Sequence, residues 1–267
     1  MLTISNYVKA KTLEEAYELN QAKSSRVMGG MMWMRLGNAR VKTVIDLSDL
    51  GLDQIEETNH VFRIGAMCTL RQLEQCEGLK ELYGDGIAEA VRHIVGVQFR
   101  NQPTVGGSIF GRFGFSDVLT ALLALDTFVE LYNGGTIRLS EFVKRKPDKD
   151  ILLSIIIRKS KRKFRYESIR QTKTDFPVIA CAVVTGIVNG QESWYFSVGA
   201  RPMKAALIEK QWEIPKDASE EMITGYAKQA ASEFSYGTNM RGSAEYRQHL
   251  AEVLIRREIH SILAEER

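Results

Sequence analysis

The sequence predicts an α+β protein that begins with a small β-α-β unit and ends with an antiparallel sheet and two helices. Short apolar strands and a helical pattern alternate over residues 1–50, whereas strands come first and helices last over residues 161–267. Two Asn-Gly pairs between apolar runs indicate hairpins. Because the 267 residues exceed the usual size of one domain, we expect two or three domains with cores of their own.

The composition is that of a globular protein rather than a membrane or disordered one. The chain is 44% hydrophobic and 26% charged, with a formal net charge of +3. It has no apolar run long enough to span a bilayer, and its first residues lack the basic-then-apolar pattern of a signal peptide. We therefore expect a cytoplasmic protein without a membrane span.

The cysteines and histidines do not have the spacing of metal ligands. No C-x-x-C pair exists, and the three cysteines are too scattered for a disulfide framework. We therefore predict neither an iron–sulfur cluster nor a zinc site held by this chain. The residues concerned are Cys68, Cys76, Cys181, His60, His93, His249 and His260.

The first predicted domain, residues 1–50, is the β-α-β unit. Residues 3–8 read as a strand, and Thr12 with Glu15 forms a capping box that starts a helix. Residues 25–28 form the next strand, which ends at Gly29-Gly30, and an apolar segment leads to a strand at 43–47. This glycine turn lies at the carboxyl end of a strand, where open α/β sheets place ligands.

The second predicted domain, residues 51–160, mixes strands and helices around a second glycine turn. The strand patterns cover 61–66 and 151–157, and a hairpin over 128–139 turns at Asn133-Gly134. We expect a short helix from Thr69, a longer helix over 86–97 and another over 116–126.

The third predicted domain, residues 161–267, has strands followed by helices. Residues 164–170, 178–188 and 193–199 alternate or run apolar, and Asn189-Gly190 supplies a hairpin turn. Helical patterns then cover 220–234 and 243–263. This order predicts an α+β domain that is separate from the preceding fold.

The stretch from Arg100 to Ile109 is the most informative part of the sequence. It places Thr104, the adjacent pair Gly106-Gly107 and Ser108 between two apolar helical patterns. Glycine lets the backbone approach a phosphate closely, and backbone N–H groups can bind an anion. A Gly-Gly pair also serves as plain turn punctuation. Since Gly29-Gly30 forms a second such turn, the two together suit a dinucleotide with two phosphates.

A basic stretch lies at the start of the third domain. Eight basic residues fall within 158–173: Arg158, Lys159, Lys161, Arg162, Lys163, Arg165, Arg170 and Lys173. Three readings stay open here, namely a solvated strand edge, a surface for an acidic or phosphorylated partner, and a nucleic-acid patch. No nucleic-acid motif accompanies the charge, so we expect no nucleic acid as partner.

Several motifs together resemble the FAD-binding subunit of molybdenum hydroxylases. The family includes the flavin domain of xanthine dehydrogenase and the medium subunit of carbon monoxide dehydrogenase. Arg100–Ile109 is close to the family's R-N-x-A-T-(I/V)-G-G-(N/S/D)-(I/L), and Val27-Met28-Gly29-Gly30 precedes it. Matching segments follow in the family's order over almost the whole chain: Asp117, 122–126, 151–155 and 241–247.

The resemblance implies a two-lobed FAD-binding domain of the vanillyl-alcohol-oxidase (PCMH) type, followed by a C-terminal sheet-and-helix domain. It implies that the FAD diphosphate lies across the two glycine turns. It also implies that Asp117 lies near the ribityl chain or flavin, that Leu152 packs by the ring and that Arg170 supplies a cationic contact. The lining residues would be Val27, Met28, Gly29, Gly30, Met31, Met32, Thr104, Val105, Gly106, Gly107 and Ser108.

The sequence departs from the family pattern at three places. Met31 stands where relatives carry a small polar residue, and residues 112–116 replace an Ala-x-Pro pattern before Asp117. Ile94 stands where some relatives place an aromatic side chain facing the flavin. The Rossmann pattern G-x-G-x-x-G is missing, which agrees with a flavin fold of another kind.

The resemblance implies an oxidoreductase subunit that transfers electrons. We expect FAD to receive electrons from the 2Fe–2S subunit of a heteromeric complex whose large subunit holds the molybdenum cofactor, and to reduce NAD as in xanthine dehydrogenase. The sequence leaves two alternatives, a carbon monoxide dehydrogenase-type subunit with a quinone acceptor and a flavin-free structural subunit. No residue of this chain is predicted to be catalytic, and none is predicted to bind a metal.

Overall fold

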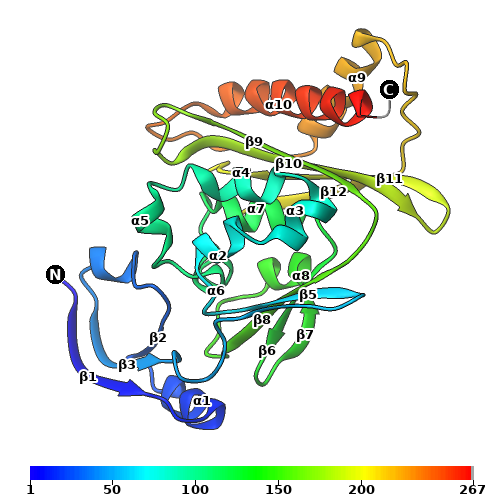
Figure 1. Ribbon diagram of the computed structural model, residues 1–267. Coiled ribbons are helices and arrows are strands. Elements are labelled where there is room, and N and C mark those ends of the chain that lie inside the picture. Colours follow the sequence, from blue (N-terminus) through cyan, green and yellow to red (C-terminus); the bar gives the residue numbers. More distant parts are fainter. Residues whose placement is uncertain (266–267) are drawn as a thin grey trace. The chain divides into compact units, whose positions relative to one another are not determined.

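The computed structural model describes residues 1–265, which form two compact units (Figure 1). The first unit comprises Met1–Leu73, Val97–Gly111 and Thr127–Ile157. The second comprises Glu74–Gly96, Arg112–Asp126 and the described residues from Arg158 onward. Within residues 1–265 no helix has both the length and the apolar character that a membrane span needs.

The first unit begins with the predicted β-α-β arrangement. Strands β1 (Thr3–Lys9), β3 (Arg40–Asp46) and β2 (Ser25–Met28) form a parallel sheet in the order β1-β3-β2. Helix α1 (Leu13–Gln21) starts as a capping box, because the Thr12 hydroxyl accepts from Glu15 N at 3.1 Å. The Glu15 carboxylate accepts from Lys11 N at 2.7 Å, which confirms the predicted capping box. The donor is one residue before Thr12, whose N–H the motif would use.

A five-stranded sheet completes the first unit. Its order is β4-β5-β8-β6-β7, with the predicted hairpin of β6 and β7 at Asn133-Gly134. Short helices connect these strands. The elements are β4 (Ile55–Glu57), β5 (Val61–Gly65), β6 (Thr127–Leu131), β7 (Gly135–Arg138), β8 (Leu152–Arg158), α2 (Leu70–Glu74), α5 (Val97–Arg100), α6 (Val105–Phe110) and α8 (Leu139–Lys144).

The second unit is built on an antiparallel sheet with helices on both faces (Figure 1). The strand order is β12-β11-β10-β9, and β10 and β11 turn at the predicted Asn189-Gly190. Its strands are β9 (Lys163–Arg170), β10 (Pro177–Val188), β11 (Gln191–Gly199) and β12 (Ala206–Lys210). Its helices are α3 (Glu77–Tyr83), α4 (Gly86–Arg92), α7 (Asp117–Leu123), α9 (Glu220–Ser232) and α10 (Ala244–Ala264).

Side-chain alternation along the central strands explains why both faces of this sheet are covered. Cys181, Val183 and Phe196 pack with α9 and α10 in one buried cluster. On the other face α4 packs on β9, and α7 packs on β10 and β11. Strands that are buried on both faces read as continuous apolar runs, and the run Val178–Val184 is fully buried.

Three predicted elements differ from the structure. The expected helix over 86–97 stops at Arg92, because Val95 takes a φ of +55° in the connection to α5. The apolar segment after Gly30 forms only a short 3-10 turn, Met34–Leu36. The second glycine turn is the first turn of helix α6, with Thr104 as its N-cap.

The basic stretch lies on an edge strand and contacts its own unit. Strand β9 is at the edge of the sheet, which agrees with the edge-strand reading. Arg165 pairs with Glu265, Lys163 donates to the Ile262 carbonyl, and Arg162 lies over the Tyr195 ring. Part of this charge therefore holds α10 against β9, while Arg162 reaches across to β11.

Candidate functional site

The two glycine turns touch each other in the first unit. The Gly29-Gly30 turn follows β2, and the second turn begins at Thr104. A Cβ added at Gly29 would lie 2.8 Å from Thr104 Oγ1 and 3.8 Å from Gly107 Cα. A Cβ added at Gly30 would collide with the Gln102 carbonyl. Glycine is therefore required for the close approach of two segments that are more than seventy residues apart in the sequence.

The N–H groups of the two turns are used differently. Val105 N donates to Cys68 O at 2.8 Å, Gly106 N to Ala66 O at 2.9 Å and Gly107 N to Thr104 Oγ1 at 3.0 Å. Within residues 1–265 the structure gives the N–H groups of Gly29 and Gly30 no partner. An anion bound here would therefore find its backbone donors in the first turn rather than in the second.

Three glycines of these turns present a surface without side chains. Gly107 is exposed, and Gly29 and Gly30 are half-buried. Among the residues that the structure describes, a Cβ added at Gly107 would meet only Thr104 Oγ1, at 3.1 Å, whereas one at Gly106 would strike Ala66. We define Gly29, Gly30 and Gly107 as the glycine ledge. A ledge of bare backbone beside free N–H groups suits an anion such as a phosphate.

The remaining predicted residues of the first unit surround these turns. Val27 and Met28 end strand β2, where they pair with Ile45 and Asp46, and Met32 is buried. Met31 is half-buried and has a φ of +56°, a backbone conformation that few residues other than glycine adopt readily.

Leu152 is joined to the second turn through the backbone. It is the buried first residue of β8, and its neighbour Leu153 accepts a hydrogen bond from Ala66 N at 2.9 Å. The carbonyl of Ala66 in turn accepts from Gly106 N. The backbone of Ala66 thus connects the start of β8 to the start of α6.

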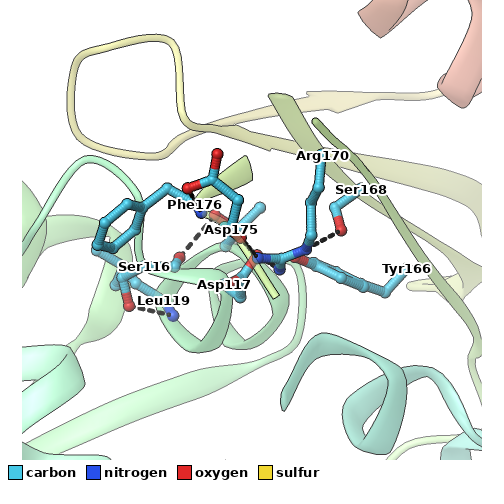
Figure 2. A network of polar contacts seen from close by, with 9 residues as sticks. Ser116, Asp117, Leu119, Tyr166, Ser168, Arg170, Asp175 and Phe176 are labelled. Carbon is cyan, nitrogen blue, oxygen red and sulfur yellow. Dashed lines mark hydrogen bonds and ion pairs between the residues drawn. The ribbon is translucent and has the colours of Figure 1, made fainter. Parts of the chain in front are cut away.

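Asp117 and Arg170 form an ion pair in the second unit (Figure 2). Arg170 Nη2 lies 2.8 Å from Asp117 Oδ1, and the Tyr166 hydroxyl donates to the same oxygen. Arg170 also donates to the Asp175 carbonyl at 2.5 Å and to Ser168 Oγ at 3.2 Å. These contacts fix the guanidinium at the end of β9 against the first residue of α7.

Tyr166 belongs to this network although the sequence reasoning did not select it. Tyr166, Ser168 and Arg170 alternate along β9, so they share the face of the sheet that α4 and α7 cover. The alternation was readable from the sequence once Arg170 had been chosen. What the sequence did not contain was that α7, more than forty residues earlier, brings Asp117 to this face.

Burial determines the electrostatics of the network. Asp117 is 4% exposed, and this burial raises the pKa of its carboxyl, while Arg170 and the Tyr166 hydroxyl act in the opposite direction. Burial, together with the charge of Asp117, raises the pKa of Tyr166 well above its usual value. Tyr166 is therefore a hydrogen-bond donor throughout the physiological range. Partial burial and the charge of Arg170 lower the pKa of His93.

The predicted site residues thus divide between the two units. The first unit gathers the two glycine turns and the start of β8, and the second gathers Asp117 and Arg170. Among residues 1–265 the structure contains no cluster of three His, Cys, Asp or Glu side chains suited to a metal ion.

Two family models match the chain one after the other. A model described as the FAD binding domain in molybdopterin dehydrogenase matches residues 3–159. A model described as the CO dehydrogenase flavoprotein C-terminal domain matches residues 164–262. Together they account for nearly the whole chain.

Known proteins resemble the chain over nearly their whole length. The medium subunit of nicotine 6-hydroxylase from Paenarthrobacter nicotinovorans is 26% identical over 272 residues, which cover 95% of each chain. Quinoline 2-oxidoreductase from Pseudomonas putida 86 has a chain with a TM-score of 0.83 at 15% identity, covering 98% of both. Reconstituted CO dehydrogenase from Oligotropha carboxidovorans gives a TM-score of 0.83 at 20% identity, also covering 98% of both chains.

Proposed function

Because this chain belongs to the FAD-binding medium subunits of the molybdenum hydroxylase family, we propose that it is the electron-transfer flavoprotein of a xanthine dehydrogenase-like enzyme. The family makes it an oxidoreductase subunit with FAD as cofactor. In this proposal a 2Fe–2S subunit delivers the electrons, a large subunit with the molybdenum cofactor oxidises the substrate, and NAD is the acceptor. The complex is proposed to work in the cytoplasm.

The observation that carries the flavin part of the proposal is the glycine ledge. FAD, when bound, supplies single-electron uptake and hydride release. We propose that the diphosphate lies along the glycine ledge, where Gly107 leaves room for it, and that the first turn donates N–H groups to it. The remaining lining residues are proposed as Val27, Met28, Met31, Met32, Thr104, Val105, Gly106 and Ser108.

The ring end of the cofactor is assigned to three further residues. We propose that Leu152 packs beside the ring system and that Asp117 and Arg170 act there as a pair rather than as separate contacts. The pairing distance of 2.8 Å supports this view, since a buried carboxylate that holds the guanidinium reduces the net charge offered to the flavin. Tyr166 keeps the carboxylate oriented.

NAD as acceptor rests on the resemblance to xanthine dehydrogenases. A carbon monoxide dehydrogenase-type subunit that reduces a quinone is the alternative, and the description of the C-terminal family model favours it equally. A flavin-free structural role is the second alternative, favoured by the strained Met31 and the altered segment 112–116. The division into lobes 1–50 and 51–160 and a C-terminal domain 161–267 belongs to the same proposal.

Reconstitution tests the proposal directly. The 2Fe–2S and molybdenum subunits of the same complex are assayed with and without this chain, using hypoxanthine with NAD, a quinone or a dye as acceptor. We expect NAD reduction only when this chain and its FAD are present, and dye reduction in either case. Full NAD-linked activity without the chain contradicts the proposal, and quinone reduction in place of NAD reduction establishes the alternative.

A further inference from the structure

Four loops meet at one end of the β9–β12 sheet in the second unit. They are residues 112–116 before α7, 171–176 between β9 and β10, 200–205 between β11 and β12, and 233–243 between α9 and α10. We call them the four-loop surface. The loops 171–176 and 200–205 lie at the same end of the sheet, because β9 and β11 end there while β10 and β12 begin there. Contacts join the other two loops to them.

Direct contacts join these loops into a closed ring. Phe113 stacks on Phe115 with ring centroids 5.3 Å apart, Phe115 lies 4.6 Å from Phe176, and the Arg241 guanidinium lies 5.0 Å over Phe176. Ala200 N donates to the Gly114 carbonyl at 2.7 Å. Gly237 N donates to the Arg201 carbonyl at 2.6 Å, which closes the ring.

The four-loop surface exposes large apolar side chains. Met240 is 92% exposed, Met203 40% and Phe113 37%. Phe113 is joined to the loop of Met240 through the stacked rings and Arg241 described above. Exposed apolar side chains that gather in one patch mark sites of interaction more often than isolated ones do. Phenylalanine, methionine and arginine are also enriched in protein interfaces.

Buried arginines hold these loops in place. Arg247, 1% exposed, donates to the carbonyls of Gly237 and Gly242 and to Asn239 Oδ1, at 2.5–2.7 Å. Arg201 donates to the carbonyls of Ser235 and Lys204 at 2.5 and 2.8 Å. Met240 is therefore presented on an ordered turn, so a partner would pay little ordering entropy on contact.

The charge beneath the surface is positive. Within residues 1–265 neither Arg201 nor Arg247 has a carboxylate partner, since their acceptors are carbonyls and one amide.

Two strained residues support the same loops, Arg112 with a φ of +47° and Ala200 with a φ of +56°. Strain of this kind persists only where the surrounding structure imposes it, and it is enriched at functional sites.

The four-loop surface is continuous with the Asp117–Arg170 pair. Asp175, in the loop before β10, accepts from Arg170 through its carbonyl and pairs with Arg241 at 3.5 Å through its carboxylate (Figure 2 shows the Arg170 side). A group that docks on the loops would therefore lie beside Asp117 and Arg170, the two residues of this unit that are assigned to the flavin ring. An electron donor must approach the flavin at such a place.

We propose that the four-loop surface is the docking site of the 2Fe–2S subunit, with Met240 and Phe113 as its apolar anchors. This inference rests on the proposed function. A cluster held by cysteine thiolates carries net negative charge, so an acidic rim around an apolar pocket on the partner would complement these loops. Anchors of this kind near the centre of an interface contribute most of its affinity.

The test compares charge insertion at the two ends of the same sheet. Met240→Asp and Phe113→Asp alter the four-loop surface, whereas Ile187→Asp alters the β10–β11 hairpin end, where Ile187 is 70% exposed. Affinity for the 2Fe–2S subunit, produced together with its molybdenum subunit, is measured by biolayer interferometry at low and high salt. Circular dichroism melts establish that each variant is folded.

We expect Met240→Asp and Phe113→Asp each to weaken binding by about tenfold or more, and Ile187→Asp to leave it unchanged. Binding of the wild type should also weaken as salt rises. Wild-type affinity in both loop variants, or an equal loss in Ile187→Asp, overturns the docking site while the proposed function stands. If the wild type itself forms no complex, the proposed function fails first and the docking site with it.

Discussion

The glycines of the two turns differ in what an added Cβ would meet, and this decides their roles. Gly30 and Gly106 are closed in by the backbone of Gln102 and by Ala66, so they are required for packing. Gly107 faces open space except for the Thr104 hydroxyl at 3.1 Å. A side chain at Gly107 would thus alter the ledge without entering the core.

Gly107→Val should abolish retention of FAD while the fold stays largely intact. The valine side chain would occupy the ledge where the diphosphate is proposed to lie, and its only close neighbour among residues 1–265 is Thr104. Flavin absorbance and far-ultraviolet circular dichroism of the purified protein measure the two effects. Gly225→Val is the matched control, because Gly225 is also exposed and helical but has no atom within 4 Å of an added Cβ. Full flavin content in Gly107→Val would show that the glycine ledge is not part of the FAD site.

Tyr166→Phe should destabilise the second unit by about 1–3 kcal/mol, because it leaves a buried carboxyl without one of its donors. The loss should be larger at pH 7 than at pH 4. Burial raises the folded-state pKa of Asp117, so its contribution to stability is complete below the unfolded value of 3.8 and declines as pH rises. Without the Tyr166 hydroxyl, which favours the ionised form, that decline steepens.

Urea unfolding at the two pH values measures this effect. Tyr195→Phe is the control, since the Tyr195 hydroxyl also donates to a carboxylate, Glu209 at 2.9 Å, but at the surface. We expect that control to cost less than about 0.5 kcal/mol. Equal losses in the two variants would show that burial of the Asp117 network adds nothing.

At the scale of single elements, helix α10 carries an unusual buried charge. Glu258 is 3% exposed, and within the described chain its carboxyl oxygens lack a well-formed hydrogen bond. Burial first, and then the charge of Glu167, raise the pKa of Glu258 well above its usual value. The groups that face it are Glu167 and Arg165 from β9 and Cys181 from β10. The helix therefore docks best when this carboxyl is protonated.

Glu258→Met should stabilise the protein by about 1–3 kcal/mol at pH 8 and have less effect at pH 4. The wild type has its full stability from this group below the unfolded pKa of 4.5 and loses it as pH rises towards the higher folded-state value. Thermal melts across this range provide the measurement. Glu252→Met, on the same helix but half-buried, is the control. A destabilised Glu258→Met at pH 8 contradicts the prediction.

The helix predicted over 86–97 shows where local pattern failed. Ile87, Ala90 and Val91 are buried at helical spacing, as the periodicity indicates. The same periodicity continued through Val95, which instead adopts a left-handed conformation and is 49% exposed. A β-branched residue takes this conformation only when its surroundings impose it, so no local rule could place the break.

At the scale of the whole molecule, each compact unit is assembled from three separate segments of the chain. Residues 74–96 and 112–126 belong to the second unit. Residues 97–111, which lie between them in the sequence, belong to the first unit. The second glycine turn and Asp117 are ten residues apart in the sequence and yet lie in different units. Sequence order alone therefore could not assign them to one body.

The sequence by itself determined the elements and motifs whose cause is local. The capping box at Thr12, the two Asn-Gly hairpins and the apolar strands follow from the hydrogen-bonding and conformational preferences of neighbouring residues. The family resemblance followed from short motifs of the same kind, and the family models confirmed it.

Only the tertiary structure decided which of these residues meet. The contact of Gly29 with Thr104, the pairing of Asp117 with Arg170 through Tyr166, and the ring of four loops all join segments far apart in the sequence. Such contacts depend on how the sheets and helices pack, since a distant side chain satisfies a buried donor or acceptor as well as a near one does. The site is therefore a property of packing, although its residues are recognisable one by one.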